Sequence, residues 1–115
     1  SGQFLDSAAI WIKDNAHEGL ILAAASSNDS LLFVSGLPLK RYITEGAQKY
    51  WEDSMIDPTI HASWIVMHKD DLVDKKMRNN EIFLNNYQLV YKDTFSYVYR
   101  LSVGEKVRLP NSDLP

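Results

Sequence analysis

The chain has 115 residues, enough for one domain with a substantial apolar core but too few for two such domains. Hydrophobic residues make up 45% and charged residues 23%, a composition typical of folded rather than disordered proteins. The net charge of -3 argues against a nucleic-acid partner, which requires clustered Lys and Arg. Because the chain has no cysteine, disulfides, thiolate catalysis and cysteine-ligated metals are excluded.

The two ends of the chain are predicted to lie outside the folded domain. The sequence begins Ser1-Gly2 without methionine, so residues 1–3 are interpreted as a tag scar or linker, and the chain as a piece of something longer. Residues 104–115 lose all periodicity and are expected to fray. The folded domain is therefore predicted to span residues 4–103. No apolar run in it reaches the roughly 20 residues that a membrane span needs.

The first part of the chain predicts one helix followed by two buried strands. Residues 5–19 repeat small and apolar side chains at helical spacing, and a glycine ends the pattern. The apolar runs "LILAAAS" (20–26) and "LLFVSG" (31–36) predict strands buried on both faces, although the alanines of the first run also suit a helix. Residues 37–46 are ambiguous and are interpreted as a short extended segment.

The middle of the chain predicts a helix, a central strand and another helix. Residues 47–55 form a helix with one apolar side, which ends before Pro58 because a residue ahead of proline avoids the helical conformation. The stretch "HASWIVMH" (61–68) has apolar residues at both parities, which is typical of a strand covered on both faces. Residues 71–85 predict a helix with Asp70 as its N-cap.

The last periodic stretch, "YQLVYKDTFSYVYRL", predicts a β-hairpin. Tyr and Leu alternate along both strands, and paired residues share one face of a sheet. A loop over residues 93–95 would place Tyr91 opposite Tyr97 and Leu89 opposite Tyr99. The tyrosines are then predicted on one face of the hairpin, either in the core or at an interface.

This order of elements predicts the α/β fold class: a single domain with a mixed sheet of about five strands, about three helices packed on it and a C-terminal β-hairpin. Within the strand over residues 61–68, both faces need cover. Trp64 in the middle of this strand is therefore predicted to pack under a helix with little solvent contact.

The sequence pattern assigns no catalytic, cofactor-binding or metal-binding residue. His61 and His68 lie about 23 Å apart on opposite faces of a strand that rises roughly 3.3 Å per residue, so they cannot share a metal. The pair Asp70-Asp71 suits helix capping and solvation better than a cation site, and "SSNDS" lacks the glycines of a phosphate-binding loop. Neither a nucleophile elbow nor a specific pair of carboxylates for glycoside hydrolysis stands out.

Three stretches together resemble a known family: "FVSGLPLKRYITEG", then "YWEDSMIDPTIHASWIVMHKDD", then "YQLVYKDTFSYVYRL". In that order they resemble the extracytoplasmic carboxy-terminal region of bacterial polytopic membrane glycosyltransferases, of the dolichyl-phosphate-mannose and aminoarabinose transferase type. There, a soluble α/β module after the last membrane helix carries a segment with two tryptophans and a proline, and ends in a tyrosine-rich hairpin. The matching positions are Trp51, Pro58, Trp64, Ile65 and Val66, followed by Tyr87, Val90, Tyr91, Tyr99 and Arg100.

The resemblance implies a parent protein that transfers a sugar from a polyprenyl-phosphate donor, with its catalytic acids in a loop that this chain does not contain. The chain would then be a non-catalytic accessory module on the extracytoplasmic face of a bacterial cell membrane. Its partners would be the membrane-embedded portion of the same polypeptide and a lipid-linked sugar or glycan acceptor. The alternative is a free-standing ligand-binding or protein-interaction domain without enzymatic activity.

Four residues are candidates for ligand binding. Arg41, Tyr42 and Glu45 lie beside a predicted strand end, where open α/β sheets often bind ligands. Trp51, like Trp64, would offer an aromatic platform for a sugar if its ring is exposed. The alternative for all of them is an ordinary role in a loop or in packing.

Overall fold

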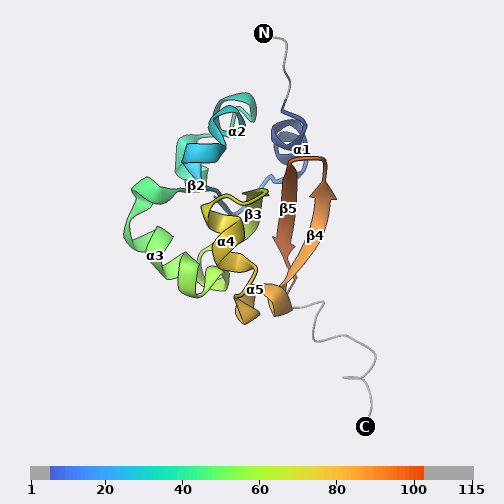
Figure 1. Ribbon diagram of the computed structural model, residues 1–115. Coiled ribbons are helices and arrows are strands. Elements are labelled where there is room, and N and C mark those ends of the chain that lie inside the picture. Colours follow the sequence, from blue (N-terminus) through green and yellow to red (C-terminus); the bar gives the residue numbers. More distant parts are fainter. Residues whose placement is uncertain (1–5, 103–115) are drawn as a thin grey trace.

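The computed structural model describes residues 6–102, in which five strands form one mixed sheet in the order β2-β1-β3-β5-β4 (Figure 1). β1 is parallel to β2 and β3, whereas β5 is antiparallel to β3 and β4. The strands are β1 (Leu20–Leu22), β2 (Tyr42–Ile43), β3 (Ala62–His68), β4 (Tyr87–Lys92) and β5 (Ser96–Leu101). The predicted α/β fold, mixed sheet and C-terminal hairpin are confirmed. The expected scar and tail, residues 1–3 and 104–115, lie outside the described residues.

Residues 6–102 contain five short α-helices rather than about three. They are α1 (Ser7–Asn15), α2 (Asp29–Val34), α3 (Lys49–Ile56), α4 (Leu72–Met77) and α5 (Glu81–Asn86). The helices predicted over residues 5–19 and 47–55 are confirmed, and α3 ends before Pro58 as expected. In the described part of the chain, no helix has the length and apolar character needed to cross a bilayer.

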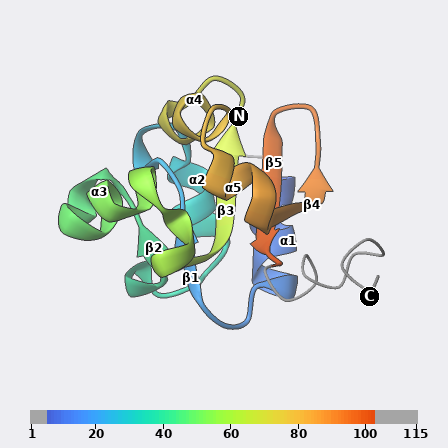
Figure 2. The same ribbon diagram turned by 90° about the horizontal axis from the view of Figure 1, so that it is seen from below.

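Helices cover both faces of the sheet, so the domain has two apolar cores. Figure 2 shows α1 and α4 on opposite sides of β3 and β5. The α1-side core lies under α1 and α2 and includes Ala9, Ile12, Ile21, Leu31, Tyr42, Val66 and Val98. The α4-side core lies under α3, α4 and α5 and includes Leu22, Ile43, Ile65, Met67, Val73, Met77 and Phe83.

β3 is the central strand, as predicted, and it supplies both cores. Ile65 and Met67 lie in the α4-side core, and Val66 lies in the α1-side core. Strict alternation along β3 would place Ala62 on the same face as Val66, but Ala62 packs in the α4-side core. The reason is a register shift in the pairing with β1, where one step along β1 corresponds to two steps along β3, around Ser63.

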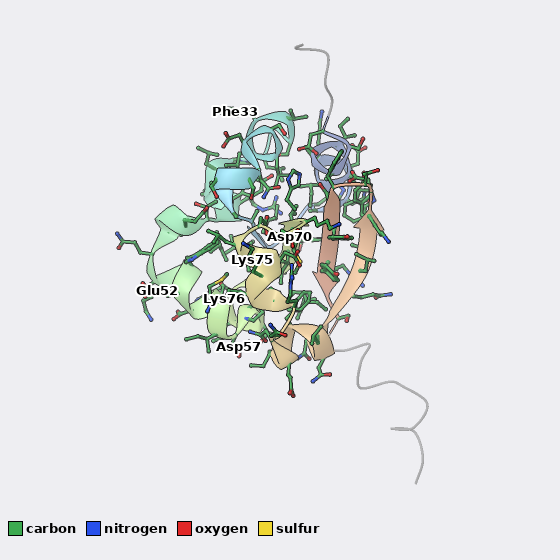
Figure 3. All side chains as sticks on the ribbon, in the orientation of Figure 1. Phe33, Glu52, Asp57, Asp70, Lys75 and Lys76 are labelled. Carbon is green, nitrogen blue, oxygen red and sulfur yellow. The ribbon has the colours of Figure 1, made fainter. Side chains whose placement is uncertain are left out.

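The prediction of a strand over residues 31–36 is wrong, because most of this stretch forms α2. β1 and β2 are adjacent and parallel, so the chain between them has to cross over one face of the sheet. There this segment forms a helix instead of pairing as a strand. Leu31 alone is fully buried under α2, while Phe33 projects into solvent with 83% of its surface exposed (Figure 3). The continuous apolar run over residues 31–36 thus belongs mostly to a helix with one buried side and not to a strand buried on both faces.

The helix predicted over residues 71–85 is divided, and its cap is one residue later than expected. Asp70 has a φ of 66°, a left-handed conformation, whereas an N-cap residue adopts an extended one. Asp71 is extended, and its carboxylate accepts the Asp74 N–H at the start of α4. Asn80 caps α5 in the same way by accepting the Phe83 N–H, so a second helix begins there.

The hairpin has the predicted loop over residues 93–95 but only part of the predicted register. Leu89 pairs with Tyr99 as expected, whereas Tyr91 pairs with Val98 instead of Tyr97. A bulge between Leu89 and Tyr91 turns the Tyr91 ring toward α1, where it lies 5.8 Å from the ring of Trp11. The prediction that all the tyrosines share one face is therefore wrong.

Trp64 lies against a helix as predicted but is half-buried rather than enclosed. Its ring meets that of Trp11 in α1 edge to face, with the centroids 6.0 Å apart. Its indole Nε1–H donates to the Glu18 carbonyl at 2.8 Å, so the polar edge is satisfied in the turn before β1. The indole thus fastens that turn to the central strand.

Gly19 in the same turn is predicted to be intolerant of any side chain. Its φ is +92°, and a Cβ there would overlap the Ser63 hydroxyl and lie 2.5 Å from Ser63 Cβ. We expect Gly19→Ala to lower the free energy of unfolding by roughly 2 to 5 kcal/mol, from backbone strain and overlap together. Gly36→Ala is the matched control, because Gly36 has a φ of +70° but open space around it, so only about 1 to 2 kcal/mol of strain applies. Equal losses of unfolding free energy for the two variants in urea denaturation would show that Ser63 of β3 is not in close contact with this turn.

Candidate functional site

Two of the four predicted ligand-binding residues, Arg41 and Tyr42, form hydrogen bonds within the domain at the amino end of the parallel strands. The Arg41 guanidinium donates from Nε to the Gly19 carbonyl at 2.7 Å and from Nη2 to the Ala16 carbonyl at 2.8 Å. Tyr42 is buried, and its hydroxyl lies 2.7 Å from Ser35 Oγ. Arg41 thereby fixes the turn between α1 and β1. Ligands of open α/β sheets bind at the opposite, carboxyl edge.

Glu45 does lie at the carboxyl edge, just after β2, but its carboxylate is occupied. Oε1 accepts the Ala25 N–H at 2.6 Å, and Oε2 accepts the N–H and the hydroxyl of Ser26 at 3.2 and 2.9 Å. Burial by itself raises the pKa of Glu45, but these donors and the residue's own N–H outweigh it and lower the pKa below its usual value of 4.5. Glu45 therefore joins the loops that follow β1 and β2.

Trp51 belongs to α3 and packs half-buried against the α4-side core together with Met55. Arg41 and Glu45 flank opposite ends of the two-residue strand β2 and form hydrogen bonds to different loops, so the four predicted residues do not form a single cluster. Their assignment to ligand binding stays a prediction, and each has a packing or hydrogen-bonding role inside the domain.

At the carboxyl ends of β1 and β3, the connections that follow the two strands leave toward opposite faces of the sheet. These strands are parallel neighbours, and the chain leaves β1 toward α2 on one face but leaves β3 toward α4 on the other. In open α/β sheets the crevice at such a switch point is where ligands bind. Here the crevice is bridged by Asp71, a buried carboxylate.

Asp71 accepts hydrogen bonds from four donors on both sides of the crevice. Oδ1 accepts the Asp74 N–H at 2.8 Å, and Oδ2 accepts the His68 N–H at 2.9 Å. Oδ2 also lies 3.1 Å from the Ser27 hydroxyl and 3.4 Å from the Asn28 side-chain amide, both in the loop after β1. One carboxylate thus caps α4 and ties the loop after β1 to the end of β3.

Beside this bridge lies a pocket of about 250 Å³, here called the β3-end pocket. Four separate segments form it: the start of α1, the first turn of α2, the end of β3, and the turn between β4 and β5 together with the first residue of β5. Figure 1 shows the β4–β5 turn and the start of α1 at the same end of the molecule. The lining residues are Asp6, Ser7, Ser30, His68, Asp93, Thr94, Phe95 and Ser96.

The two carboxylates of the pocket are held in place by hydrogen bonds from the protein. Asp6 caps α1 by accepting the Ala9 N–H at 3.0 Å, and its other oxygen accepts the Ser30 hydroxyl at 2.8 Å. Asp93 Oδ1 accepts the N–H groups of Phe95 and Ser96 at 2.9 and 2.8 Å. The pocket therefore presents fixed acceptors rather than mobile side chains.

Asp93 is ionised at neutral pH although it is partly buried. Burial raises its pKa. The Tyr91 hydroxyl, the two backbone N–H groups and the neighbouring His68 lower the pKa by more than burial raises it, so the net shift is downward. Burial and the hydrogen bond to Asp93 in turn raise the pKa of Tyr91 to about 12. The Tyr91 hydroxyl thus stays protonated and donates to Asp93 Oδ2 at 2.7 Å.

Sequence reasoning missed this pocket because its lining comes from four segments that only the tertiary fold brings together. The sequence pattern does not single out Asp6, Asp93 or Phe95; it only excludes a metal shared by His68 and His61 and a phosphate-binding loop at "SSNDS". A usable signal was Phe95, an aromatic residue inside a polar hairpin turn, which is 63% exposed. Across residues 6–102, no group of three or more His, Asp or Glu side chains is arranged to hold a metal ion.

Comparison with known proteins adds no assignment: no family model, no curated protein and no solved structure matches the chain. The class that fold and site define is an α/β domain with a small pocket, lined mainly by polar residues, at the carboxyl end of its central strand.

The bridge made by Asp71 is predicted to be sensitive to replacement of a single oxygen atom. In Asp71→Asn, one carboxylate oxygen becomes an NH2 group, which faces either the Asp74 N–H or the donors at Oδ2, whichever way the amide turns. We expect a loss of about 1 to 3 kcal/mol in the free energy of unfolding. Asp70→Asn is the matched control, since it removes only an exposed pair with Arg78 and should destabilise the fold clearly less than Asp71→Asn. Equal midpoints in urea for the two variants would contradict the bridging role.

The contribution of Glu45 to stability is predicted to depend on pH. Because its pKa is lowered in the folded state, the ionised carboxylate stabilises the fold above the unfolded-state pKa, and this stabilisation is lost as the pH falls through the folded-state pKa. Wild type should therefore exceed Glu45→Gln in free energy of unfolding at neutral pH, and the difference should shrink below pH 4.5. Urea denaturation at a series of pH values measures it. A difference that does not change with pH would mean that the charge of Glu45 is not what the Ala25 and Ser26 donors recognise.

Proposed function

We propose that the chain is a non-catalytic accessory domain of a bacterial membrane glycosyltransferase that uses a lipid-linked sugar donor. It would lie on the extracytoplasmic face of the cell membrane, next to the membrane-embedded portion of the same polypeptide. Its role would be to support binding of the glycan acceptor or the lipid-linked donor, while the catalytic acids reside elsewhere in the parent protein.

The observation that supports this proposal is the location of the residues that carry the resemblance. Ile65 and Val66 enter opposite cores from adjacent positions of β3, and Trp64 fastens the turn before β1. In the hairpin, Tyr87 is buried and its hydroxyl donates to the Ala62 carbonyl at 2.6 Å. Residues at these positions determine the fold, so a shared pattern here is what a common fold would produce.

The division of polar residues within the domain suits a supporting role. Arg41 and Glu45 form internal hydrogen bonds at the amino and the carboxyl ends of the parallel strands, respectively. The β3-end pocket, by contrast, combines Asp6 and Asp93 with hydroxyl groups and an exposed aromatic ring. Such a lining can recognise a small polar ligand by hydrogen bonding without performing a reaction on it.

The proposal predicts the organisation of the gene and the behaviour of the isolated domain. The reading frame that encodes this chain should contain several apolar segments of about 20 residues upstream of Phe4. Purified residues 1–115 should show no turnover of nucleotide sugars or model glycosides in a coupled assay.

Two results would contradict the proposal. A complete reading frame of about this length, without upstream apolar segments, would favour a free-standing ligand-binding or interaction domain. Turnover by the purified chain that Asp93→Asn abolishes would instead assign catalysis to the pocket itself.

A further inference from the structure

We propose that the β3-end pocket binds a single pyranose ring of a neutral saccharide. This inference deepens the proposed function and rests on it for the biological role of the saccharide, namely as part of an acceptor or donor glycan. The chemical inference itself comes from the charge, hydrogen-bonding groups and size of the pocket.

The charge of the lining excludes an anionic ligand. The pocket contains two carboxylates, Asp6 and Asp93, and among residues 6–102 no Lys or Arg lines it. A phosphate or carboxylate ligand would meet two like charges, against which the lining sets only the imidazole of His68. The electrostatics therefore favour a neutral or a cationic ligand.

The carboxylates keep acceptor positions available for a ligand. Each carboxylate oxygen can accept about two hydrogen bonds. From the described part of the chain, Asp93 Oδ2 accepts one hydrogen bond, from the Tyr91 hydroxyl, and Asp6 Oδ2 accepts one, from Ser30. Because both carboxylates are fixed by the protein, a ligand hydroxyl that donates to them requires little further ordering of side chains.

The other polar groups favour a hydroxylated ligand over an amine. Ser7 and Thr94 contribute hydroxyls, which both donate and accept, and His68 contributes an imidazole with a donor or acceptor nitrogen. A sugar hydroxyl also donates and accepts, so it can use both kinds of group. An ammonium ion only donates, so it could bond to the carboxylates and the hydroxyl oxygens but could not accept from the O–H and N–H donors of the lining.

Phe95 adds an apolar surface beside these polar groups. It lies in the β4–β5 turn with 63% of its surface exposed, and its neighbours in the turn are Thr94 and Ser96. The C–H face of a pyranose ring packs on an aromatic ring while its hydroxyls point to the side, toward hydrogen-bonding groups. An exposed aromatic ring at the edge of a polar pocket provides this combination.

The size of the pocket limits the ligand to one ring. Its volume of about 250 Å³ lies just below the roughly 300 to 1,000 Å³ of pockets that enclose drug-sized molecules. One monosaccharide unit is of this size, and further units of a glycan would extend into solvent.

The proposal is tested by NMR titration of 15N-labelled residues 1–115. The probes are methyl pyranosides of common neutral hexoses and pentoses, with ethanolamine and inorganic phosphate as the cationic and anionic comparisons, each at tens of millimolar. We expect at least one neutral pyranoside to shift the backbone amides of His68, Thr94 and Ser96. Phe95→Ala should weaken this binding roughly three- to tenfold. Thr94→Val, which removes an exposed hydroxyl with little change in volume, should weaken it as well.

The matched control is Phe33→Ala, which removes an equally large and more exposed ring on α2 that does not line the pocket (Figure 3). It should leave the affinity unchanged. Binding of ethanolamine or phosphate alone, shifts that map to Trp51 or Trp64 instead of the pocket, or no shift with any pyranoside would overturn the proposal. None of these three results bears on the upstream reading frame, so failure of this inference and failure of the proposed function are separately observable.

Discussion

The structure depends on the position of β3 between a parallel and an antiparallel neighbour. β1 pairs with it on one side and β5 on the other, so its backbone hydrogen bonds are shared with both halves of the sheet. Its side chains enter both cores: Ile65 and Met67 pack in the α4-side core and Val66 packs in the α1-side core. A strand with two apolar faces has to be covered twice, which is why helices pack on both sides of so small a domain.

The location of the candidate site follows from the same arrangement. Because β1 and β3 are parallel, their carboxyl ends lie at one edge of the sheet, and the chain departs from them to opposite faces. Asp71 bridges the loops that leave this edge, and its hydrogen bond to the His68 N–H fixes the end of β3. The antiparallel neighbour β5 begins at this same edge, opposite His68, so the hairpin turn with Asp93 and Phe95 closes the pocket. The switch from parallel to antiparallel pairing thus joins the crevice and the turn into one site.

Local patterns predicted the parts of the fold that depend on local chemistry. Apolar residues at both parities identified β3, and Pro58 located the end of α3. The prediction of a strand over residues 31–36 was wrong. Because β1 and β2 pair in parallel, the segment between them crosses over the sheet as a helix that is buried on one side only, and a local pattern does not contain this pairing. The cap at Asp71 differed by one residue, since the left-handed conformation of Asp70 depends on how the chain leaves the sheet. The pocket depends most on long-range contacts, and its lining was accordingly not predicted as a site.

Amide hydrogen exchange under native conditions tests the central role of β3 most directly. If β3 holds both cores, the amides of Ile65, Val66 and Met67 should exchange only through global unfolding, at the full free energy of unfolding. The amides of β4, an edge strand with partly exposed side chains, should open at a lower free energy. Exchange of the β3 amides by local opening, at a free energy equal to or below that of β4, would contradict this account of the fold and of the site built at its end.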